Sequence, residues 1–182
     1  ARTDSAPIHC VDFDNEGGGR RAAEHLLQRG RRHFAIITGP LGLQANVDRW
    51  RGFDAALAEA GHGHAEVSHG DFTRGSGAAA MRDLLARGSD IDAVFAAGDA
   101  IAAGALTALR ASGLRVPDDL ALIGFDDDWV ATDVEPLLTS VHQPVEEMGR
   151  EAARLLRSQL RGIAVPEPKV TLGAHLVVRD ST

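Results

Sequence analysis

Carboxylates, aromatic rings and turn residues follow apolar, strand-like runs of this sequence at the points where four of those runs end. The four places are Asp12-Phe13-Asp14, Gly39-Pro40, Gly98-Asp99 and Phe125-Asp126-Asp127-Asp128. Carboxylates accept hydrogen bonds from hydroxyl groups, arginine donates them in a fork, and aromatic rings cover apolar faces. If the four strand ends share one rim of a sheet, we expect that rim to bind a small polyhydroxyl or purine-like ligand.

The acidic residues among them also have structural explanations. Asp99 begins a helix-like segment, where the more common role of an aspartate is to cap the helix. Asp14 and Asn15 are candidate caps of an earlier helix for the same reason. The run Asp126–Asp128 is typical of a solvated loop. Because it directly follows a buried strand, the pattern leaves open that one of its members faces a cleft.

Other motifs that could do chemistry give weaker signals. Arg49 and Arg51 lie near a helix start, and their spacing does not decide which of them is a surface residue. His62 and His64 form a pair without a third ligand, so we expect no metal site there. Gly17-Gly18-Gly19 lacks the Gly-Lys-Ser/Thr ending and the spacing of a phosphate loop. We therefore expect neither a metal nor a cofactor.

The elements that must position these residues alternate between strands and helices. Apolar runs indicate strands over residues 8–13, 33–38, 65–68, 93–96 and 120–124, and apolar stripes indicate helices over residues 16–29, 47–60, 74–87 and 99–112. Gly30, Gly61 and Gly113 directly follow three of the helices, and glycine tolerates the left-handed backbone that ends a helix. The alternation predicts an α/β fold with a doubly wound parallel sheet, whose ligands bind at the carboxyl ends of the strands.

The pattern changes after Phe125. Residues 126–136 indicate an acidic loop, and residues 139–141 a short extended piece. Pro144 is expected to open a helix that runs to Leu160, because proline favours the first helical position. A turn with Pro166 and Pro168 precedes a last strand over residues 170–178, which we expect to join one of the sheets.

Composition excludes several classes of protein. The 182 residues carry a formal net charge of −7 and contain no basic block, so they have no electrostatic footprint for nucleic acid. No apolar run approaches the length of a bilayer span, and no signal-peptide core is present. The single cysteine, Cys10, fits a reducing compartment. We expect a cytoplasmic protein that contacts no membrane, and any DNA binding must lie outside these residues.

Short motifs along almost the whole chain resemble those of LacI/GalR transcription regulators. The most specific is the run from Gly113 to Asp127, which includes Gly124-Phe125-Asp126-Asp127. The other matching segments, in chain order, are Val11–Gly18, Phe34–Pro40, Arg49–Leu57, Asp92–Ala105, Pro136–Pro144 and Val178–Thr182.

The resemblance implies a periplasmic-binding-protein-like architecture of two lobes joined by three crossovers. It further implies that a small effector, such as a sugar or a related metabolite, binds between the lobes. In such regulators the effector changes the spacing of DNA-binding heads in a homodimer. This chain would contact operator DNA only through a head that lies outside it, and it would not be an enzyme.

By motif position, the resemblance also implies the residues of the effector site. Arg49 would be the effector-binding arginine, Asp126 the hydroxyl-accepting carboxylate, and Gln143 a residue near a crossover. Phe13 and Phe72 would be wall aromatics, and Asp99 completes the candidate set. The family usually has Asn-Asp where this chain has Gly98-Asp99, so one polar ligand contact is missing.

The resemblance implies a complete C-terminal lobe and only fragments of the N-terminal lobe. The lobe boundaries that we expect are residues 1–13 for the end of the N-terminal lobe, 14–141 for the C-terminal lobe, 142–167 for the returning helix of the N-terminal lobe, and 168–182 for the closing strand of the C-terminal lobe. Without the rest of its lobe, the returning helix would expose Met148, Leu155 and Leu156, which favours docking on another segment or chain.

Two alternatives remain open at this stage. A free periplasmic sugar-binding protein shares the fold, although the Gly-Phe-Asp-Asp and Gln-Pro motifs favour the regulator. A haloacid-dehalogenase-type phosphatase would use Asp12-x-Asp14 as its nucleophile motif and the carboxylates after Phe125 to hold Mg²⁺. Glu16 stands where those enzymes prefer threonine or valine, and Lys169, the only lysine, follows the acidic motif rather than preceding it.

Overall fold

The computed structural model describes residues 9–88, 90–163 and 169–182. The chain divides into two units, a larger one of residues 15–143 and 174–182 and a smaller one of residues 1–14 and 144–173. The N-terminal linker and the turn with Pro166 and Pro168 lie outside the described residues. No helix in the described part of the chain is long and apolar enough to cross a membrane.

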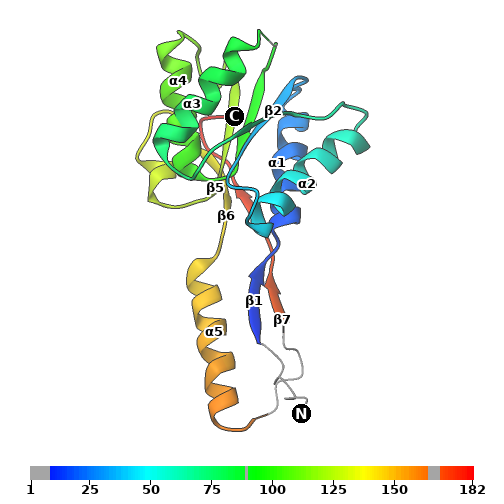
Figure 1. The fold of residues 1–182 in the computed structure, drawn as a ribbon, viewed down its shortest axis with the longest axis vertical. Helices are drawn as coiled ribbons and strands as arrows, with labels where there is room; N and C mark the ends of the chain where they lie inside the picture. Colours follow the sequence, from blue (N-terminus) through cyan, green and yellow to red (C-terminus); the bar gives the residue numbers. More distant parts are fainter. Residues whose placement is uncertain (1–8, 89, 164–168) are drawn as a thin grey trace. The chain divides into compact units, whose positions relative to one another are not determined.

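A six-stranded sheet forms the centre of the larger unit (Figure 1). The strand order is β3-β2-β4-β5-β6-β8, in which the first five strands are parallel and β8 runs antiparallel to β6. The strands are β2 (Phe34–Thr38), β3 (Glu66–His69), β4 (Ala93–Ala96), β5 (Ala121–Asp126), β6 (Thr139–His142) and β8 (His175–Val177). Every residue of β2 and β4 is buried, as expected for parallel strands that are covered on both faces. The predicted α/β class is confirmed.

Four helices cover this sheet as two packed pairs. Helix α1 packs against α2, and α3 packs against α4. The two pairs lie on opposite faces of the sheet (Figure 1). Phe53 of α2 stacks on Phe95 of β4, with 5.0 Å between ring centroids, within the core on the α1–α2 side. The helices are α1 (Asn15–Gln28), α2 (Gln44–Glu59), α3 (Arg74–Ala86) and α4 (Asp99–Ala111), and a short 3-10 helix η1 (Trp129–Thr132) follows β5.

Helices α1 and α2 cross at a pair of glycines. A Cβ atom on Gly19 would lie 2.0 Å from the carbonyl oxygen of Arg49, and one on Gly52 would lie 1.9 Å from the carbonyl oxygen of Glu16. Any side chain at either position would force the two backbones apart. The run Gly17–Gly19 therefore lies inside a helix, where it allows close packing, and it does not form a phosphate loop.

Helices α3 and α4 repeat this arrangement. A Cβ atom on Gly77 would lie 2.2 Å from the carbonyl oxygen of Ile101, and one on Gly104 would lie 2.0 Å from the carbonyl oxygen of Arg74. Both helix pairs thus depend on reciprocal glycines at their closest approach. Each crossing fixes where the first turns of its helices lie relative to the strand ends.

The smaller unit contains a separate two-stranded parallel sheet and one helix. Strand β1 (Cys10–Phe13) pairs with β7 (Lys169–Leu172), and α5 (Val145–Leu160) packs on β1. The single closing strand expected over residues 170–178 is therefore wrong, because β7 and β8 belong to different sheets. Asp12 forms an ion pair with Lys169 at 2.8 Å within this unit.

The starts of α2 and α5 and the cap of α4 differ from those expected. Helix α2 begins three residues early, at Gln44, behind an N-cap residue, Leu43, whose side chain has no capping bond and so gives no signal in the sequence. Pro144 occupies the N-cap of α5 rather than its first helical position. Asp99 is wrongly assigned as a cap, because the N-cap of α4 is Gly98 and Asp99 is the first residue of the helix itself.

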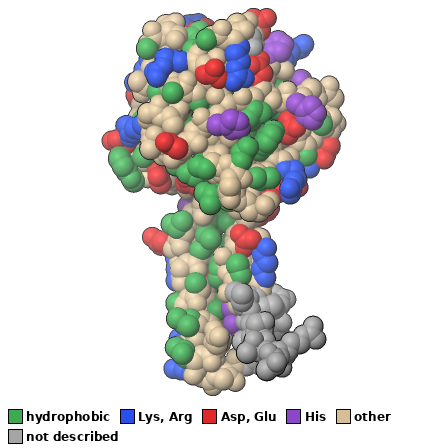
Figure 2. Space-filling model, viewed as in Figure 1, with side chains coloured by type: hydrophobic (Ala, Val, Ile, Leu, Met, Phe, Trp, Pro, Cys, Tyr) green, Lys and Arg blue, Asp and Glu red, His purple; other side chains and the backbone are tan. Residues whose placement is uncertain are grey.

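Helix α5 buries only part of its apolar stripe within the smaller unit. Leu155 is buried, Met148 is half-buried, and Leu156 and Leu160 are 56% and 79% exposed. Figure 2 shows hydrophobic side chains along the exposed side of this helix. The expectation of an exposed stripe is thus wrong for Leu155, holds only in part for Met148, and holds for Leu156.

Candidate functional site

A buried arginine is the centre of a polar cluster at the carboxyl ends of the central strands. Arg49 lies on α2, which follows β2, and it is only 6% exposed. Its Nη1 atom donates to the carbonyl oxygen of Ala97 at 2.7 Å, directly after β4, and its Nε atom donates to Asn15 Oδ1 at 2.9 Å. These bonds fix the plane of the guanidinium group. Arg51 is exposed and pairs with Asp48, so the ambiguity between the two arginines is resolved.

Two further contacts join this arginine to the ends of β5 and β6. Arg49 Nη1 lies 3.5 Å from Asp126 Oδ1, and its Nη2 atom lies 3.5 Å from Gln143 Oε1. The guanidinium carbon lies 3.6 Å from the centroid of the Phe125 ring, in a cation–π contact. The two 3.5 Å contacts are long for charged hydrogen bonds, so ligand oxygens could replace them with shorter ones.

The backbone turns sharply at Asp126 and directs its carboxylate toward Arg49. Asp126 has φ 100° and Asp127 has φ 54°, both in the left-handed region that non-glycine residues rarely adopt. Such strain costs about 1–3 kcal/mol per residue and is concentrated at functional sites. The Asp126 side chain is 35% exposed, so one part of its carboxylate still faces solvent.

The other two members of the acidic run have structural partners. Asp127 accepts hydrogen bonds from Arg179 Nη2 at 2.6 Å, and it pairs with His142 Nδ1 at 2.9 Å. Asp128 caps η1 by accepting from the backbone N–H of Val130 at 2.7 Å. Of the three carboxylates, Asp126 is thus the one directed at the arginine.

Asp99 lies behind this cluster and is 1% exposed. Its Oδ1 atom accepts from Ser140 Oγ at 2.7 Å, and its Oδ2 atom accepts from the backbone N–H of Asp128 at 2.9 Å. A Cβ atom on Gly124 would lie 2.1 Å from Asp99 Oδ1, so the glycine leaves room for this carboxyl group. Asp99 therefore connects α4, β6 and the loop after β5, and it positions the cluster from within.

Burial shifts the pKa of all three ionisable groups, Asp99, Asp126 and Arg49. Burial raises the pKa of Asp99 to about 7, against the hydrogen bonds from Ser140 and Asp128. Burial also raises the pKa of Asp126 to about 6, against the attraction of Arg49. The pKa of Arg49 is lowered by burial, and Asp126 partly opposes that shift. The cluster therefore holds acids that titrate near neutral pH.

The raised pKa of Asp99 predicts that stability falls as pH rises from about 4 to about 7. The folded state binds the proton on the Asp99 carboxyl group more tightly than the unfolded chain does, whose aspartate pKa is about 3.9. This proton binding therefore adds fully to the free energy of unfolding below about pH 4, and the contribution is lost as the pH rises through about 7. Asp99→Asn keeps an amide that can donate to Ser140 and an oxygen that can accept from Asp128. We expect the variant to unfold like the wild type at pH 4 and to be more stable by about 1–3 kcal/mol at pH 8.

Chemical denaturation at both pH values measures this difference. Asp118→Asn, at an exposed carboxylate, is the matched control and should leave the pH profile unchanged. Parallel wild-type and Asp99→Asn profiles would show that the carboxyl group is ionised in the folded protein at all these pH values.

Phe72 lies beside the cluster in a strained conformation. It has φ 68°, which is unusual for a bulky side chain, and it is 37% exposed. A Cβ atom on Gly39 would lie 2.5 Å from Phe72 Cζ, and one on Gly98 would lie 3.4 Å from Phe72 Cδ1. The ring therefore lies close to Gly39 and Gly98, the glycines that follow β2 and β4.

Phe13 is the predicted site residue that the larger unit does not contain. It ends β1 in the smaller unit and is buried. Three of the four expected strand ends share one sheet, whereas Asp12-Phe13-Asp14 lies at the end of β1, a strand of the other sheet. The larger unit thus brings together Arg49, Asp126 and Gln143, with Asp99 behind them and Phe72 beside them.

Sequence reasoning missed three partners in this cluster. Asn15 was expected to cap a helix, yet it holds the guanidinium group of Arg49. The sequence patterns did not indicate Ser140 or the carbonyl of Ala97 as partners. Ser140 could have been found from its place in a strand whose residues 139–141 are all buried. A buried hydroxyl group requires a hydrogen-bond partner, so this serine was a candidate for a contact inside the protein.

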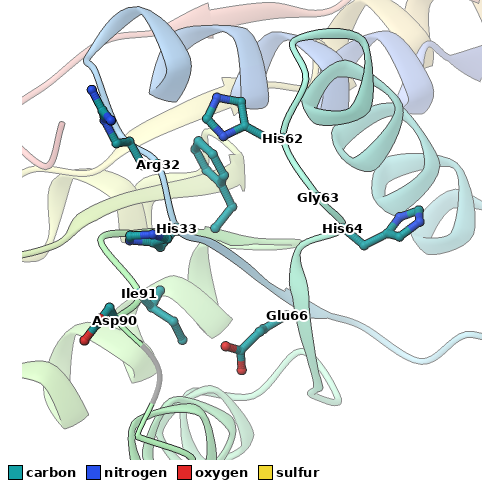
Figure 3. A pocket seen from close by; sticks show the side chains of 9 residues that line it. Arg32, His33, His62, Gly63, His64, Glu66, Asp90 and Ile91 are labelled. Carbon is teal, nitrogen blue, oxygen red and sulfur yellow. The ribbon is translucent and has the colours of Figure 1, made fainter.

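A hollow lies at the amino end of β2, at the rim of the sheet opposite the Arg49 cluster (Figure 3). Side chains of both charge signs surround it, including Arg32, Glu66 and Asp90. His62 contacts the Phe34 ring edge-on, and Figure 3 shows His64 pointing away from it. Within residues 9–88, 90–163 and 169–182, no group of three or more histidine, cysteine or acidic side chains is arranged to hold a metal.

Comparisons with known proteins identify relatives of the whole chain. Residues 23–182 match the family model described as a periplasmic binding protein-like domain. The HTH-type transcriptional regulator CelR of Thermobifida fusca is 51% identical over 176 residues, which are 96% of this chain and 52% of that protein. The chain spans about half the length of the curated relatives it matches.

Solved structures of transcriptional regulators also resemble this chain. A complex of the transcriptional regulator CelR with cellobiose superposes with a TM-score of 0.92 at 49% identity, covering 97% of this chain and 54% of that one. The lac repressor dimer bound to operator and the anti-inducer ONPF superposes with a TM-score of 0.91 at 30% identity, covering 99% and 63%. These relatives are regulators rather than enzymes.

Proposed function

The chain belongs to the LacI family of transcriptional regulators, and we propose that it is the effector-sensing part of a sugar-responsive repressor. The observation that carries this proposal is the buried Arg49, held by Asn15 and Ala97 and placed 3.5 Å from the Asp126 carboxylate. This arrangement offers a fixed donor fork beside an acceptor, with no nucleophile or metal required. Neighbouring hydroxyl groups of a sugar match such a donor–acceptor pair.

We propose that the effector is a disaccharide of glucose, and cellobiose is the first ligand to test. Support comes from the solved complex of CelR with cellobiose, whose protein is 49% identical to this chain. The exposed part of Asp126 and the half-exposed ring of Phe72 supply a hydroxyl acceptor and an apolar surface. Sugars use both, because their hydroxyls lie at the rim and their C–H groups lie on the faces.

We assign the larger unit to the C-terminal lobe of a two-lobed fold and the smaller unit to the N-terminal lobe. The exposed stripe of α5 supports this assignment, because burial of the exposed parts of Leu156 and Leu160 would contribute about 1–2 kcal/mol each. In the proposed arrangement the rest of the N-terminal lobe covers this stripe.

The proposed mechanism is a shift between two lobe arrangements in a homodimer. An effector changes their populations only if it binds one arrangement better than the other. An effector that contacts Arg49 and Asp126 in one lobe and groups of the other lobe would favour the arrangement in which it can contact both lobes at once. DNA binding would belong to an N-terminal head, as the operator complex of the lac repressor supports.

The test is a pair of measurements on the full-length protein. Calorimetric titration with cellobiose should give saturable binding, and gel-shift assays with DNA from the upstream region of its gene should show a complex that cellobiose changes. Binding of sugar without any DNA complex would favour the free periplasmic sugar-binding protein. Absence of binding by any sugar in a panel of mono- and disaccharides would overturn the sugar assignment.

Effector affinity is expected to depend on pH through Asp126. Its pKa of about 6 means that roughly a tenth of the carboxylate is ionised at pH 5 and nearly all of it at pH 7.5. Because the ionised form is the stronger acceptor, the affinity for cellobiose should rise up to about tenfold over this range. In Asp126→Asn the affinity should be low and independent of pH. A wild-type affinity that is equal at pH 5 and pH 7.5 would remove Asp126 from the contact with the sugar.

A further inference from the structure

The turn at Asp126 and Asp127, after β5, has a backbone that requires support. Asp126 has φ 100° and Asp127 has φ 54°, and neither residue is a glycine. Strained backbone of this kind persists only where the surrounding structure fixes it. The backbone angles at Asp126 also set the direction of its side chain. Whatever fixes this turn therefore places the Asp126 carboxylate as well.

Asp127 makes the contacts that fix the turn. Its Oδ1 atom accepts from Arg179 Nη2 at 2.6 Å, and its Oδ2 atom lies 2.9 Å from His142 Nδ1. Its backbone N–H donates to Ser140 Oγ at 3.1 Å. The Asp127 side chain is 11% exposed, so these contacts are largely shielded from solvent. Both of its carboxylate oxygens thus have partners within the protein.

Arg179 reaches Asp127 from the C-terminal segment that follows β8. Its side chain is 17% exposed, and its Nη1 atom donates to the carbonyl oxygen of Leu138 at 2.7 Å. The buried Ser181 holds the same segment separately, because its Oγ atom donates to the carbonyl oxygen of Leu122 at 2.6 Å. The guanidinium group of Arg179 therefore does more than attach the segment to the sheet. It joins the segment to the turn after β5.

We infer that Arg179 and Asp127 are positioning residues for Asp126, because their ion pair fixes the turn that directs the Asp126 carboxylate toward Arg49. This inference rests on the proposed function. It extends that function from the residues proposed to contact the effector to a pair that acts through one of them.

Loss of the ion pair is expected to release the Asp126 carboxyl group. The two backbone angles could then return to the region that ordinary residues prefer. Of the charged groups around this carboxylate, Arg49 attracts it, whereas Asp128 in the same loop and Asp99 on α4 repel it. Burial also disfavours its ionised form. A turn that is no longer fixed should therefore let the carboxyl group move toward solvent.

Titration of Asp126 by nuclear magnetic resonance tests this inference without any sugar. The full-length protein is labelled with carbon-13 at aspartate, and the Asp126 signal is the one lost in Asp126→Asn. In Arg179→Ala the pKa of Asp126 should fall from about 6 toward the ordinary value of about 3.9, because the released group is no longer buried. Arg179→Lys keeps the charge that pairs with Asp127, so its Asp126 pKa should lie between these values. Arg115→Ala, which removes an exposed ion pair with Asp119, is the matched control and should keep the wild-type pKa of Asp126.

Calorimetric titration with cellobiose measures the consequence for binding. At pH 7.5 the affinity of Arg179→Ala should be about tenfold lower than that of the wild type, because the hydroxyl acceptor has moved. The variant should also lose most of the rise in affinity between pH 5 and pH 7.5, as Asp126→Asn does. A residue that only supports the fold would lower the unfolding temperature and leave the affinity and pH profile of the folded protein unchanged.

Other results would overturn specific statements. An Asp126 pKa that is equal in the wild type and in Arg179→Ala, or already near 3.9 in the wild type, would overturn the positioning role. If Arg179→Lys behaved like Arg179→Ala, the effect would not come from the ion pair. A wild type that binds no cellobiose would count against the proposed function, while the titration of Asp126 would still decide on the positioning role. Should Arg179→Ala fail to fold, Asp127→Asn removes the same ion pair and should lower the pKa of Asp126 in the same direction.

Discussion

Replacement of Arg49 by alanine is expected to weaken effector binding about a hundredfold or more. The variant loses the donor fork, and it leaves Asp126 without its nearest cation. Hydrogen bonds to charged groups contribute about 1.5–3 kcal/mol each, and each 1.4 kcal/mol corresponds to a factor of ten in affinity. Two lost bonds to sugar hydroxyls therefore account for the expected effect. Calorimetric titration of the full-length protein with cellobiose measures it.

Two further variants distinguish a binding role from a purely structural one. Arg51→Ala is the matched control, because Arg51 lies two residues away on the same helix and is exposed, and it should bind as the wild type does. Arg49→Lys keeps the charge but not the planar fork. It should therefore be more stable than Arg49→Ala, but its affinity for cellobiose should be little higher than that of Arg49→Ala. A folded Arg49→Ala protein that binds cellobiose with wild-type affinity would show that the arginine only supports the fold.

Gly52→Ala is expected to destabilise the larger unit by about 1–3 kcal/mol, as overpacking of a tight interior does. The added Cβ atom would lie 1.9 Å from the carbonyl oxygen of Glu16, so α1 and α2 must move apart. Because α1 begins at Asn15 and α2 carries Arg49, this movement should also loosen the bond between these two side chains. Urea denaturation measures the first effect, and cellobiose affinity measures the second.

Gly75→Ala provides the control for a helical glycine without close neighbours. It lies in the first turn of α3, and an added Cβ atom would meet only Thr73 Oγ1 at 3.8 Å. This substitution should be neutral or stabilising, because alanine loses less backbone entropy than glycine in a helix. If Gly52→Ala were as stable as Gly75→Ala, the two helices would not be held at their crossing by the glycines.

Local patterns in the sequence were sufficient to predict the core of the fold. Alternating apolar strands and striped helices specify β4 at its observed limits and α1, α3 and α4 to within one residue at each end. The glycines at positions 30, 61 and 113 have φ between 76° and 82°, as a left-handed helix end requires. These features depend on neighbours within one turn or one strand, and so the sequence displays them directly.

The features that sequence patterns did not predict depend on contacts between distant segments. Residues 169–172 and 175–177 read as one strand, and only their pairing with β1 and with β6 separates them. The sequence pattern indicates Asp99 as a cap, but Gly98 has that position, and the Asp99 carboxyl group accepts from the hydroxyl of Ser140, 41 residues away. The choice between Arg49 and Arg51 depends on which face of α2 meets the sheet. Family resemblance indicated Arg49, and the residue composition alone did not.

The central claim is that one sugar molecule contacts Arg49 and Asp126 at the same time. A crystal structure of the full-length protein with cellobiose tests it most directly. Sugar hydroxyls are expected within hydrogen-bonding distance of both the guanidinium group and the carboxylate. Cellobiose bound in the hollow near Arg32 and His62, with the Arg49–Asp126 cluster occupied by water alone, would contradict it.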